Sequence, residues 1–236
     1  MKSLSIQNAG FLSRLKPTVI LYDTITHDVS GSRTYSATSP ATISMTIGSN
    51  SNRILIVWVL RGNTTTNSSG VTWNGVSLTK YGHITSSVGG VNHVHELWYL
   101  IAPSTGSSTV SISFTDGSVN AVASSIYNVN QVSTFGTLQS EGSFSNASSR
   151  TISVTTNQDK SWVVSVAGLT YGGGVSTTAS TGVTGLANSN AGNGYSNANG
   201  FQSALTANSY NNTYSFSGSS GTIQSILAVE MKANET

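Results

Sequence analysis

The sequence predicts an all-β protein: a two-sheet, jelly-roll-like antiparallel β-sandwich with an extended N-terminal arm. Only 8% of the 236 residues are charged, against roughly a quarter in an average soluble domain, which excludes coiled coils and helices laced with salt bridges. Ser, Thr, Asn and Gly fill half of the chain, and short apolar runs recur between clusters of these residues. Such runs are typical of strands joined by turns. A net charge of +2 is too low for an ordinary disordered chain, so we expect a folded one.

Strands are expected wherever β-branched and aromatic residues are concentrated between turn formers. Residues 109–114 alternate apolar and polar side chains, which indicates a strand with one wet face. Residues 54–60 and 162–166 are apolar on both faces and should lie in mid-sheet, covered on both sides by loops or by another subunit. The expected strands are Val19–Thr26, Ala41–Ile47, Arg53–Leu60, Gly70–Trp73, Val76–Lys80, His93–Ile101, Thr109–Phe114, Ala121–Val129, Thr151–Thr155, Ser161–Leu169, Ser203–Ala207, Thr213–Ser217 and Ile223–Lys232.

One hairpin is well defined by its turn. Asn74-Gly75 joins two alternating runs, and this dipeptide favours a type I′ turn because both of its central residues need positive φ. We therefore expect residues 71–79 to form a two-residue β-hairpin.

A weak internal repeat relates two further hairpins. Residues 42–46 followed by 54–59 resemble residues 151–155 followed by 162–166, at an offset of 109 residues. Either the two halves of the fold use similar hairpins, or a Ser- and Thr-rich chain produces the likeness by chance.

The chain divides into an arm, residues 1–17, and one β-sandwich domain, residues 18–236. The arm mixes basic and apolar residues and ends at Pro17. Residues 172–200 are almost all Gly, Ser, Thr, Asn and Ala, and we expect a long surface loop with at most one weak strand, at 181–186. The candidate attachment residues of the arm are Leu4, Ile6, Phe11, Leu12, Arg14 and Leu15.

Several partner classes are not expected. Lys and Arg are scattered, without the stripe that follows a phosphate backbone, so we expect no nucleic-acid partner. The longest apolar run, Ile54–Leu60, is far shorter than the ~20 residues of a membrane helix, so we expect no membrane partner. Residues 1–17 contain no continuous apolar stretch typical of a secretion signal.

Catalytic motifs are also lacking. There is no Cys, and no Gly-x-Ser-x-Gly motif marks a nucleophile among the serines. The eight acidic residues are widely separated, although two of them meeting in space would suit a glycoside hydrolase. We therefore expect a protein that is not an enzyme and needs no cofactor, and we keep a hydrolase with dispersed carboxylates as an alternative.

His93 and His95 are the weak candidates for a metal site. Residues i and i+2 of a strand share a face, and two imidazoles so placed can bind zinc or iron. However, Tyr99 occupies the position where a cupin metal site needs a Glu, and Glu96 should point to the opposite face. We favour a solvated histidine pair without metal, and note His83 as a conceivable third ligand.

Aromatic residues supply the candidate glycan contacts, which are Tyr171, Tyr195, Phe201 and Tyr210. They lie in or near the Gly- and Asn-rich region, where an aromatic ring can stack on a sugar and amides can bind its hydroxyls. The competing interpretation, which we favour, is that these rings anchor a loop to the sandwich or fill a subunit contact.

A series of motifs resembles one family of domains. The motifs are residues 51–57 (SNRILIV), 71–79 (VTWNGVSLT), 96–103 (ELWYLIAP), 109–114 (TVSISF), 123–131 (ASSIYNVNQ) and 226–232 (ILAVEMK). In this order they resemble a Gly-, Ser- and Thr-rich β-sandwich domain of tailed-phage virion proteins and bacterial surface proteins. The resemblance covers residues 40–232 and implies a fold and a setting, but no catalytic residue.

The resemblance and the composition together suggest a function. We expect a non-enzymatic virion structural protein of a phage, made in the host cytoplasm, such as a capsid decoration protein, a head fibre or a tail appendage. Its partners would be other virion proteins of the capsid or tail and further copies of itself, bound through the arm and subunit contacts. The alternative is an adhesin or carbohydrate-binding module on an extracellular surface, which would bind a cell-surface glycan through the loop aromatics.

Overall fold

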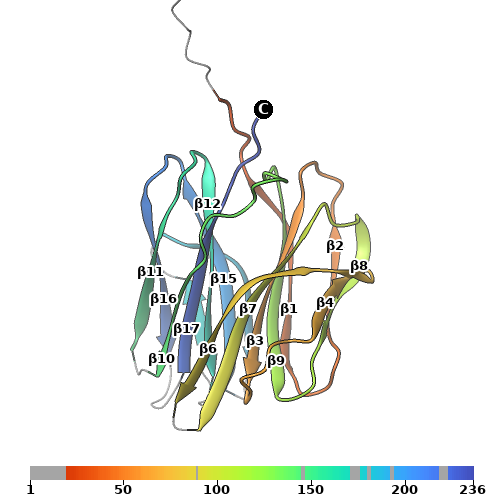
Figure 1. Cartoon of the computed structure of the whole chain (residues 1–236), viewed down its shortest axis with the longest axis vertical. Coiled ribbons are helices and arrows are strands. Elements are labelled where there is room, and N and C mark those ends of the chain that lie inside the picture. Colours follow the sequence, from red (N-terminus) through yellow and green to blue (C-terminus); the bar gives the residue numbers. More distant parts are fainter. Residues whose placement is uncertain are drawn as a thin grey trace, which may run out of the picture.

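The computed structural model describes residues 20–88, 90–144, 147–170, 176–179, 182–191, 194–217 and 223–236. These residues form seventeen strands and no helix, so none of them belongs to a helix that could cross a membrane. The strands form antiparallel sheets stacked face to face (Figure 1). The predicted all-β sandwich is therefore confirmed, but its described strands form four sheets rather than two.

The first two sheets form what we call the N-terminal sandwich. Its outer sheet consists, in spatial order, of β2 (Ala41–Ile47), β8 (Gly106–Ser113), β4 (Gly70–Trp73) and β5 (Val76–Ser77). Its inner sheet consists of β1 (Thr26–Ser36), β9 (Ser118–Tyr127), β3 (Ile54–Gly62), β7 (Val91–Ile101) and β6 (Thr79–Val88).

The other two sheets form the C-terminal sandwich. Its inner sheet consists of β10 (Gln139–Phe144), β17 (Ile223–Met231), β12 (Ser161–Thr170), β15 (Tyr195–Ala204) and β14 (Thr184–Ala191). Its outer sheet consists of β11 (Ser149–Thr155), β16 (Ser209–Ser217) and β13 (Ser176–Ala179).

The two inner sheets pack against each other, and we call the interface between them the seam. Alternate residues of β3 point to opposite faces: Leu55 and Val57 enter the core of the N-terminal sandwich, while Ile54 and Ile56 enter the seam. A strand that is apolar on both faces needs a layer on each side. The other half of the same chain supplies that layer, and not the loops or second subunit that the sequence suggested.

The two sandwiches have the same strand order. In the inner sheets β1, β9, β3, β7 and β6 correspond to β10, β17, β12, β15 and β14, and in the outer sheets β2, β8 and β4 correspond to β11, β16 and β13. Across the seam β1 contacts β14 and β6 contacts β10, which is the arrangement of a two-fold axis parallel to the strands. The internal repeat of the sequence therefore falls on equivalent pairs of consecutive strands, β2–β3 and β11–β12. The prediction that each pair is a hairpin is wrong, because the first strand lies in an outer sheet and the second in an inner sheet.

The Gly- and Asn-rich region differs most from its prediction. Most of the described part of 172–200 belongs to two strands, β14 and β15, and not to a loop. Glycine is used there for close approach, since a Cβ on Gly200 would lie 2.6 Å from the Thr184 carbonyl oxygen. The asparagines are used for buried hydrogen bonds, such as Asn199 Nδ2 to Ser124 Oγ at 3.1 Å. Pattern rules that count Gly and Asn as turn formers miss both uses.

Other strand predictions vary in accuracy. β2 and β4 match their expected bounds, and the hairpin at Asn74-Gly75 is confirmed by φ values of 48° and 78°. By contrast, β1 lies at 26–36 rather than 19–26, and β10 was not expected at all. Both are polar edge strands of the inner sheets, so they carry little apolar signal.

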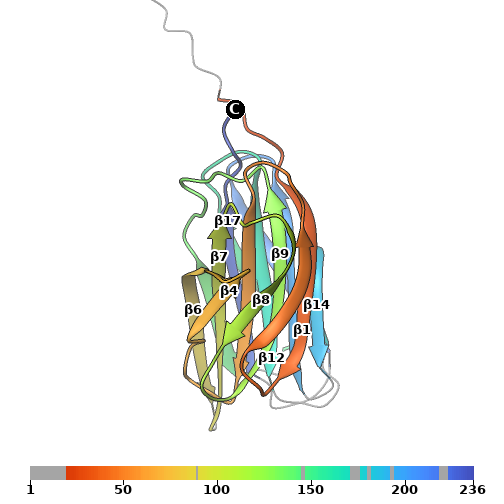
Figure 2. The ribbon, with the colours of Figure 1, turned by 90° about the vertical axis from the view of Figure 1, so that its right-hand side faces the viewer.

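The slab has two different ends (Figures 1 and 2). At the terminal end the first and last described segments lie side by side, because Tyr22 bridges Glu235 and the Asp23 amide donates to the Asn234 carbonyl at 2.9 Å. At the opposite, distal end the strands are joined by loops, including residues 63–69 between β3 and β4 and residues 114–117 between β8 and β9.

Candidate functional site

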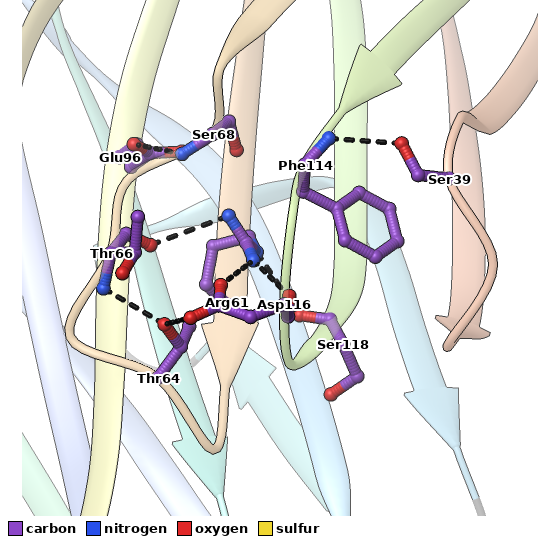
Figure 3. Close-up of polar contacts among 9 residues, drawn as sticks. All are labelled: Ser39, Arg61, Thr64, Thr66, Ser68, Glu96, Phe114, Asp116 and Ser118. Atoms are coloured by element: carbon purple, nitrogen blue, oxygen red, sulfur yellow. Dashed lines mark hydrogen bonds and ion pairs between the residues drawn. The ribbon is translucent and has the colours of Figure 1, made fainter.

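Two distal loops of the N-terminal sandwich are joined by a buried arginine (Figure 3). Arg61 is the penultimate residue of β3 and is fully buried. Its guanidinium donates to the carbonyl oxygens of Thr66 and Ser118, each at 3.3 Å, and to the carbonyl of Asp116. It also pairs with the Asp116 carboxylate at 3.1 Å and lies 4.9 Å from the centre of the Phe114 ring. One side chain thus links both loops to the sandwich.

Asp116 completes the link between the loops. Its Oδ2 accepts a hydrogen bond from Thr64 Oγ1 at 2.8 Å. Thr64 Oγ1 in turn accepts a hydrogen bond from the Thr66 amide at 2.8 Å. The Thr64 hydrogen bond is the main cause of the lowered pKa of Asp116, and the Arg61 charge adds to it. The turn depends on Gly117 (φ +62°), where a Cβ would lie 2.4 Å from the Gly62 carbonyl oxygen.

Glu96 of β7 holds the other end of the 63–69 loop. Its buried carboxylate accepts the Ser68 amide at 3.0 Å and the Trp98 indole N–H at 3.3 Å. Burial raises the pKa of Glu96, and these hydrogen bonds oppose the rise. Burial likewise lowers the pKa of Arg61, while the charges of Glu96 and Asp116 oppose that change. Arg61 therefore has its ion-pair partner in Asp116, while Glu96 is held by the N–H donors of Ser68 and Trp98.

The Arg61 and Glu96 side chains are engaged within the protein. The guanidinium is occupied by carbonyl groups and Asp116, and Glu96 by two N–H donors. The loops that they hold present hydroxyl and amide groups to solvent with a single carboxylate. The exposed residues of the two loops are Asn63, Thr65, Thr66, Ser69, Thr115, Asp116 and Gly117.

The sequence analysis did not single out Arg61 as a site residue. A usable signal was present, because Arg61 ends the apolar run of residues 54–60 and Glu96 interrupts the run 94–101. Ions inside strands that are apolar on both faces must find partners. A charged residue in each of two such strands therefore indicates a buried polar cluster, whose partners here come from the distal loops and from Trp98.

His93 and His95 share a face of β7, as expected, and Glu96 points to the opposite face. They are not solvated, however, because both are fully buried in the seam. His93 Nδ1 lies 3.0 Å from Thr170 Oγ1, and His95 Nδ1 lies 2.9 Å from Ser225 Oγ. Burial lowers the pKa of each to about 3, so both are neutral.

The histidines do not form a metal centre with other ligands among the described residues. No group of three His, Cys, Asp or Glu side chains is placed to hold a metal within that part of the chain. His83 is exposed and pairs in register with Glu96, so it lies on the other face of the sheet. The histidines instead join the two sandwiches, because Thr170 and Ser225 belong to β12 and β17.

The candidate glycan aromatics do not form one platform. Tyr195 is only 6% exposed and packs against Tyr35 of β1. Phe201 stacks on Trp162 at a centroid distance of 3.6 Å and lies against the seam core. Tyr210 packs on the core of the C-terminal sandwich, and its hydroxyl donates to the Thr206 carbonyl. Tyr171 lies outside the described residues.

Three shallow depressions lie on the surface of the described residues. The one of about 390 Å³ between β14 and β15 has small and amide residues in its lining, and another of about 470 Å³ lies over β2 and β8. A third lies beside Tyr81 and Phe135. None of the three is lined by a carboxylate.

The arm residues Leu4, Ile6, Phe11, Leu12, Arg14 and Leu15 also lie outside the described residues. Comparisons with protein-family models, with curated proteins and with solved structures found no match.

Proposed function

We propose that this protein is a non-enzymatic structural component of a phage virion that attaches by its terminal end and projects its distal end outward. A capsid decoration protein, a head fibre and a tail appendage all fit this description. One observation carries the proposal: the two ends of the described chain lie together at one end of the slab, opposite loops that are held rigidly. In this arrangement, attachment through residues 1–17 leaves the distal loops unobstructed.

The buried charges support a structural role. Glu230 accepts the amides of Asn157 and Gln158 and the Ser161 hydroxyl, at 2.9, 3.1 and 2.9 Å, and so fixes the loop between β11 and β12. Glu96 fixes a loop at the distal end. These two buried acids therefore serve different loops at opposite ends of the slab, whereas a glycoside hydrolase needs two carboxyl groups within roughly 5–10 Å.

The surface composition supports display on a particle. The outward residues of β2 and β8 are Ser and Thr, and their hydroxyls pair across the strands, as Thr46 and Ser107 do at 2.8 Å. Thr151 and Thr213 pair in the same way on the opposite face, at 2.7 Å. Together with the motif resemblance, these uncharged polar faces suit a virion component released by lysis of the host, with an extracellular surface protein as the alternative setting.

The proposal is tested by deleting residues 1–17. We expect the shortened protein to remain folded and soluble, with an unchanged far-ultraviolet circular dichroism spectrum, but to lose binding to purified particles that lack the protein. A full-length control with residues 1–17 in scrambled order separates sequence-specific docking from the mere presence of a segment. Attachment of the shortened protein at the wild-type level would refute the role of residues 1–17.

Glycan binding is the alternative for this protein. The described aromatics offer it little support, since Tyr195 and Phe201 are packed inside the fold. Tyr210 is the one that retains partial exposure outside the seam. Binding to a glycan array that is abolished by Tyr210→Ala would favour the alternative.

A further inference from the structure

Large apolar side chains that remain exposed gather at the terminal end. Ile20 is 53% exposed, Leu21 59%, Leu205 76% and Val132 98%, and we call these four residues the terminal-end patch. Among the described residues, Val76 is the remaining large hydrophobic residue in this class, and it lies in the β4–β5 hairpin. Single exposed hydrophobic residues need no explanation, but a group at one end of a molecule indicates a contact surface.

The patch is held by a fixed framework. The segment 232–236 runs between residues 21–23 and 128–130, because the Thr236 amide donates to the Leu21 carbonyl at 2.9 Å and the Asn130 amide donates to the Lys232 carbonyl at 2.9 Å. Val132 follows directly, and its amide donates to Asn130 Oδ1 at 3.0 Å. The patch residues therefore have settled backbone positions and need no ordering before a partner binds.

Lysine side chains near the patch are already engaged. Lys160 Nζ donates to the Tyr22 carbonyl at 2.8 Å, while the Lys160 amide donates to the Leu205 carbonyl at 3.4 Å, which brings Leu205 near the first described residues. Lys232 Nζ donates to Ser133 Oγ at 3.2 Å. The partner of this surface is therefore expected to be mainly apolar.

The chain itself carries a segment of that chemistry. Residues 1–19 lie outside the described part and join it at Ile20, within the patch. They include Leu4, Ile6, Phe11, Leu12 and Leu15. Because residues 1–19 join the described chain within the patch itself, two copies that meet at their terminal ends bring the segment of each copy to the patch of the other. A segment of 12 residues spans up to about 40 Å when extended.

We propose that the terminal-end patch is the docking surface for residues 4–15 of a second copy, so that the protein self-associates by exchanging its N-terminal segments. The inference rests on the proposed role of residues 1–17 in attachment, but it is tested in solution without any particle. Exchange in both directions would bury apolar area at two equivalent sites, which raises the stability of the assembly without a large contact at either site.

The test is the mass of the purified protein by analytical ultracentrifugation from about 1 to 100 μM. We expect the full chain to be larger than its 24.4 kDa monomer, and the protein without residues 1–17 to be monomeric. Val132→Ser with Leu205→Ser should weaken association at least about tenfold, because two apolar contacts are lost. Val76→Ser, a change of the same kind on an exposed residue outside the patch, should leave association unchanged.

A synthetic peptide of residues 1–17 identifies the occupant. It should bind the protein that lacks these residues, and should bind the same protein with the two patch substitutions at least about tenfold less tightly. A full chain that is monomeric at 100 μM, or patch variants that associate like wild type, would overturn the inference. Failure of particle attachment alone would bear on the proposed function and not on this exchange.

Discussion

The N- and C-terminal sandwiches are two versions of one framework, and their cores differ at equivalent positions. Ile54 of β3 corresponds to Trp162 of β12, because they oppose Ile126 and Met231 in register and all four lie in the seam core. When β3 and β12 are aligned in this way, Arg61 corresponds to Leu169. In this alignment Val59 corresponds to Ala167. Because Val59 pairs with Glu96 and Ala167 pairs with Ala198, Glu96 corresponds to Ala198.

The C-terminal sandwich has its own polar cluster elsewhere. The Tyr214 hydroxyl donates to the Ser165 carbonyl at 3.0 Å, and Asn212 Nδ2 donates to Ser165 Oγ at 2.6 Å. By the same alignment Ser165 corresponds to Val57. In β2 and β11 the 109-residue offset of the repeat places Ile152 on Ile43, and Tyr214 then corresponds to Ile112. Each half thus buries polar groups where the other half is apolar. The strand order does not depend on either cluster, so each is a local addition that fixes particular loops or strands.

The two halves also contribute different residues to the seam. His95 opposes Leu60 in β3, and the equivalent residue Asn197 opposes Gly168 in β12. A Cβ on Gly168 would lie 2.9 Å from His95 Cε1, so the small residue makes room for the ring. The two equivalent positions related by the pseudo-two-fold axis therefore hold different groups, the imidazole of His95 and the amide of Asn197.

The largest expected effect is acid destabilisation through the seam. The pKa values of His93 and His95 are about 3 in the folded chain, below the ordinary 6.5. The unfolded chain therefore binds more protons between pH 6.5 and 3, and stability falls as the pH drops through that window and is level above it. Each histidine contributes up to about 1.4 kcal/mol per pH unit. Urea unfolding at pH 7, 5.5 and 4.5 measures this slope.

A substitution from the other half sharpens the acid test. His95→Asn copies the equivalent Asn197 and should roughly halve the pH dependence, because one of the two buried imidazoles is gone. His83→Asn, on an exposed residue, is the matched control and should change the slope far less. A slope that is the same in His95→Asn and wild type would show that the acid sensitivity arises elsewhere.

The next largest effect is expected at Arg61. Arg61→Ala removes the donor of three loop carbonyl groups, leaves a cavity and frees both distal loops, which should lower the free energy of unfolding by about 3–5 kcal/mol. Arg33→Ala, on an exposed residue of β1, should change it by less than about 0.5 kcal/mol. Chemical denaturation of both variants measures the difference.

The comparison predicts partial rescue of the Arg61 site. The double variant Arg61→Leu with Glu96→Ala has the residues that the C-terminal sandwich has at the equivalent positions, Leu169 and Ala198. It removes both charges together. It should be more stable than Arg61→Leu alone, since in the single variant the Glu96 carboxylate stays buried without the attraction of the Arg61 charge. Equal stability of the two variants would contradict the view that Glu96 depends on Arg61.

A smaller effect is expected in the C-terminal sandwich. Tyr214→Phe removes one buried hydroxyl with its hydrogen bond to the Ser165 carbonyl and should cost about 1–1.5 kcal/mol. Tyr210→Phe, which removes a more exposed hydroxyl bonded to Thr206, is the control and should cost less. If Tyr214→Phe is as damaging as Arg61→Ala, the two clusters are not comparable local additions.

The smallest effect is expected at the exposed side of the Arg61 cluster. Asp116→Asn keeps the shape of the turn but removes a carboxylate whose side chain is 48% exposed. Because solvent screens such a pair, the cost should be below about 1 kcal/mol. A thermal unfolding midpoint within a few degrees of wild type agrees with this expectation, and a loss comparable to Arg61→Ala contradicts it.

The sequence predicted the elements whose signal is local. The dipeptide Asn74-Gly75 is typical of a type I′ turn. The alternation of Ile43 and Met45 with Ser and Thr indicates that β2 is a strand with one face in solvent. The four-layer arrangement was harder to predict. A strand that is apolar on both faces must be covered on both sides, but its sequence does not show which part of the molecule covers it. The equal strand orders identify the cover as the second half of the chain.

The candidate site depended on long-range pairing. Arg61 and Glu96 lie 35 residues apart in the sequence, and only the sheet order brings them to one core. Burial of Tyr195 and His95 likewise depends on the seam between halves, which the weak repeat suggested but did not define.

Single-cysteine labelling on assembled particles tests the polarity of the slab most directly, because the chain has no cysteine of its own. Thr65→Cys marks an exposed distal loop, and Val132→Cys marks the terminal end. Both variants should react with a maleimide as free proteins that lack residues 1–17, because the terminal end is then uncovered. On the particle, the account predicts that Thr65→Cys still reacts while Val132→Cys is protected; the reverse pattern would contradict attachment through the terminal end.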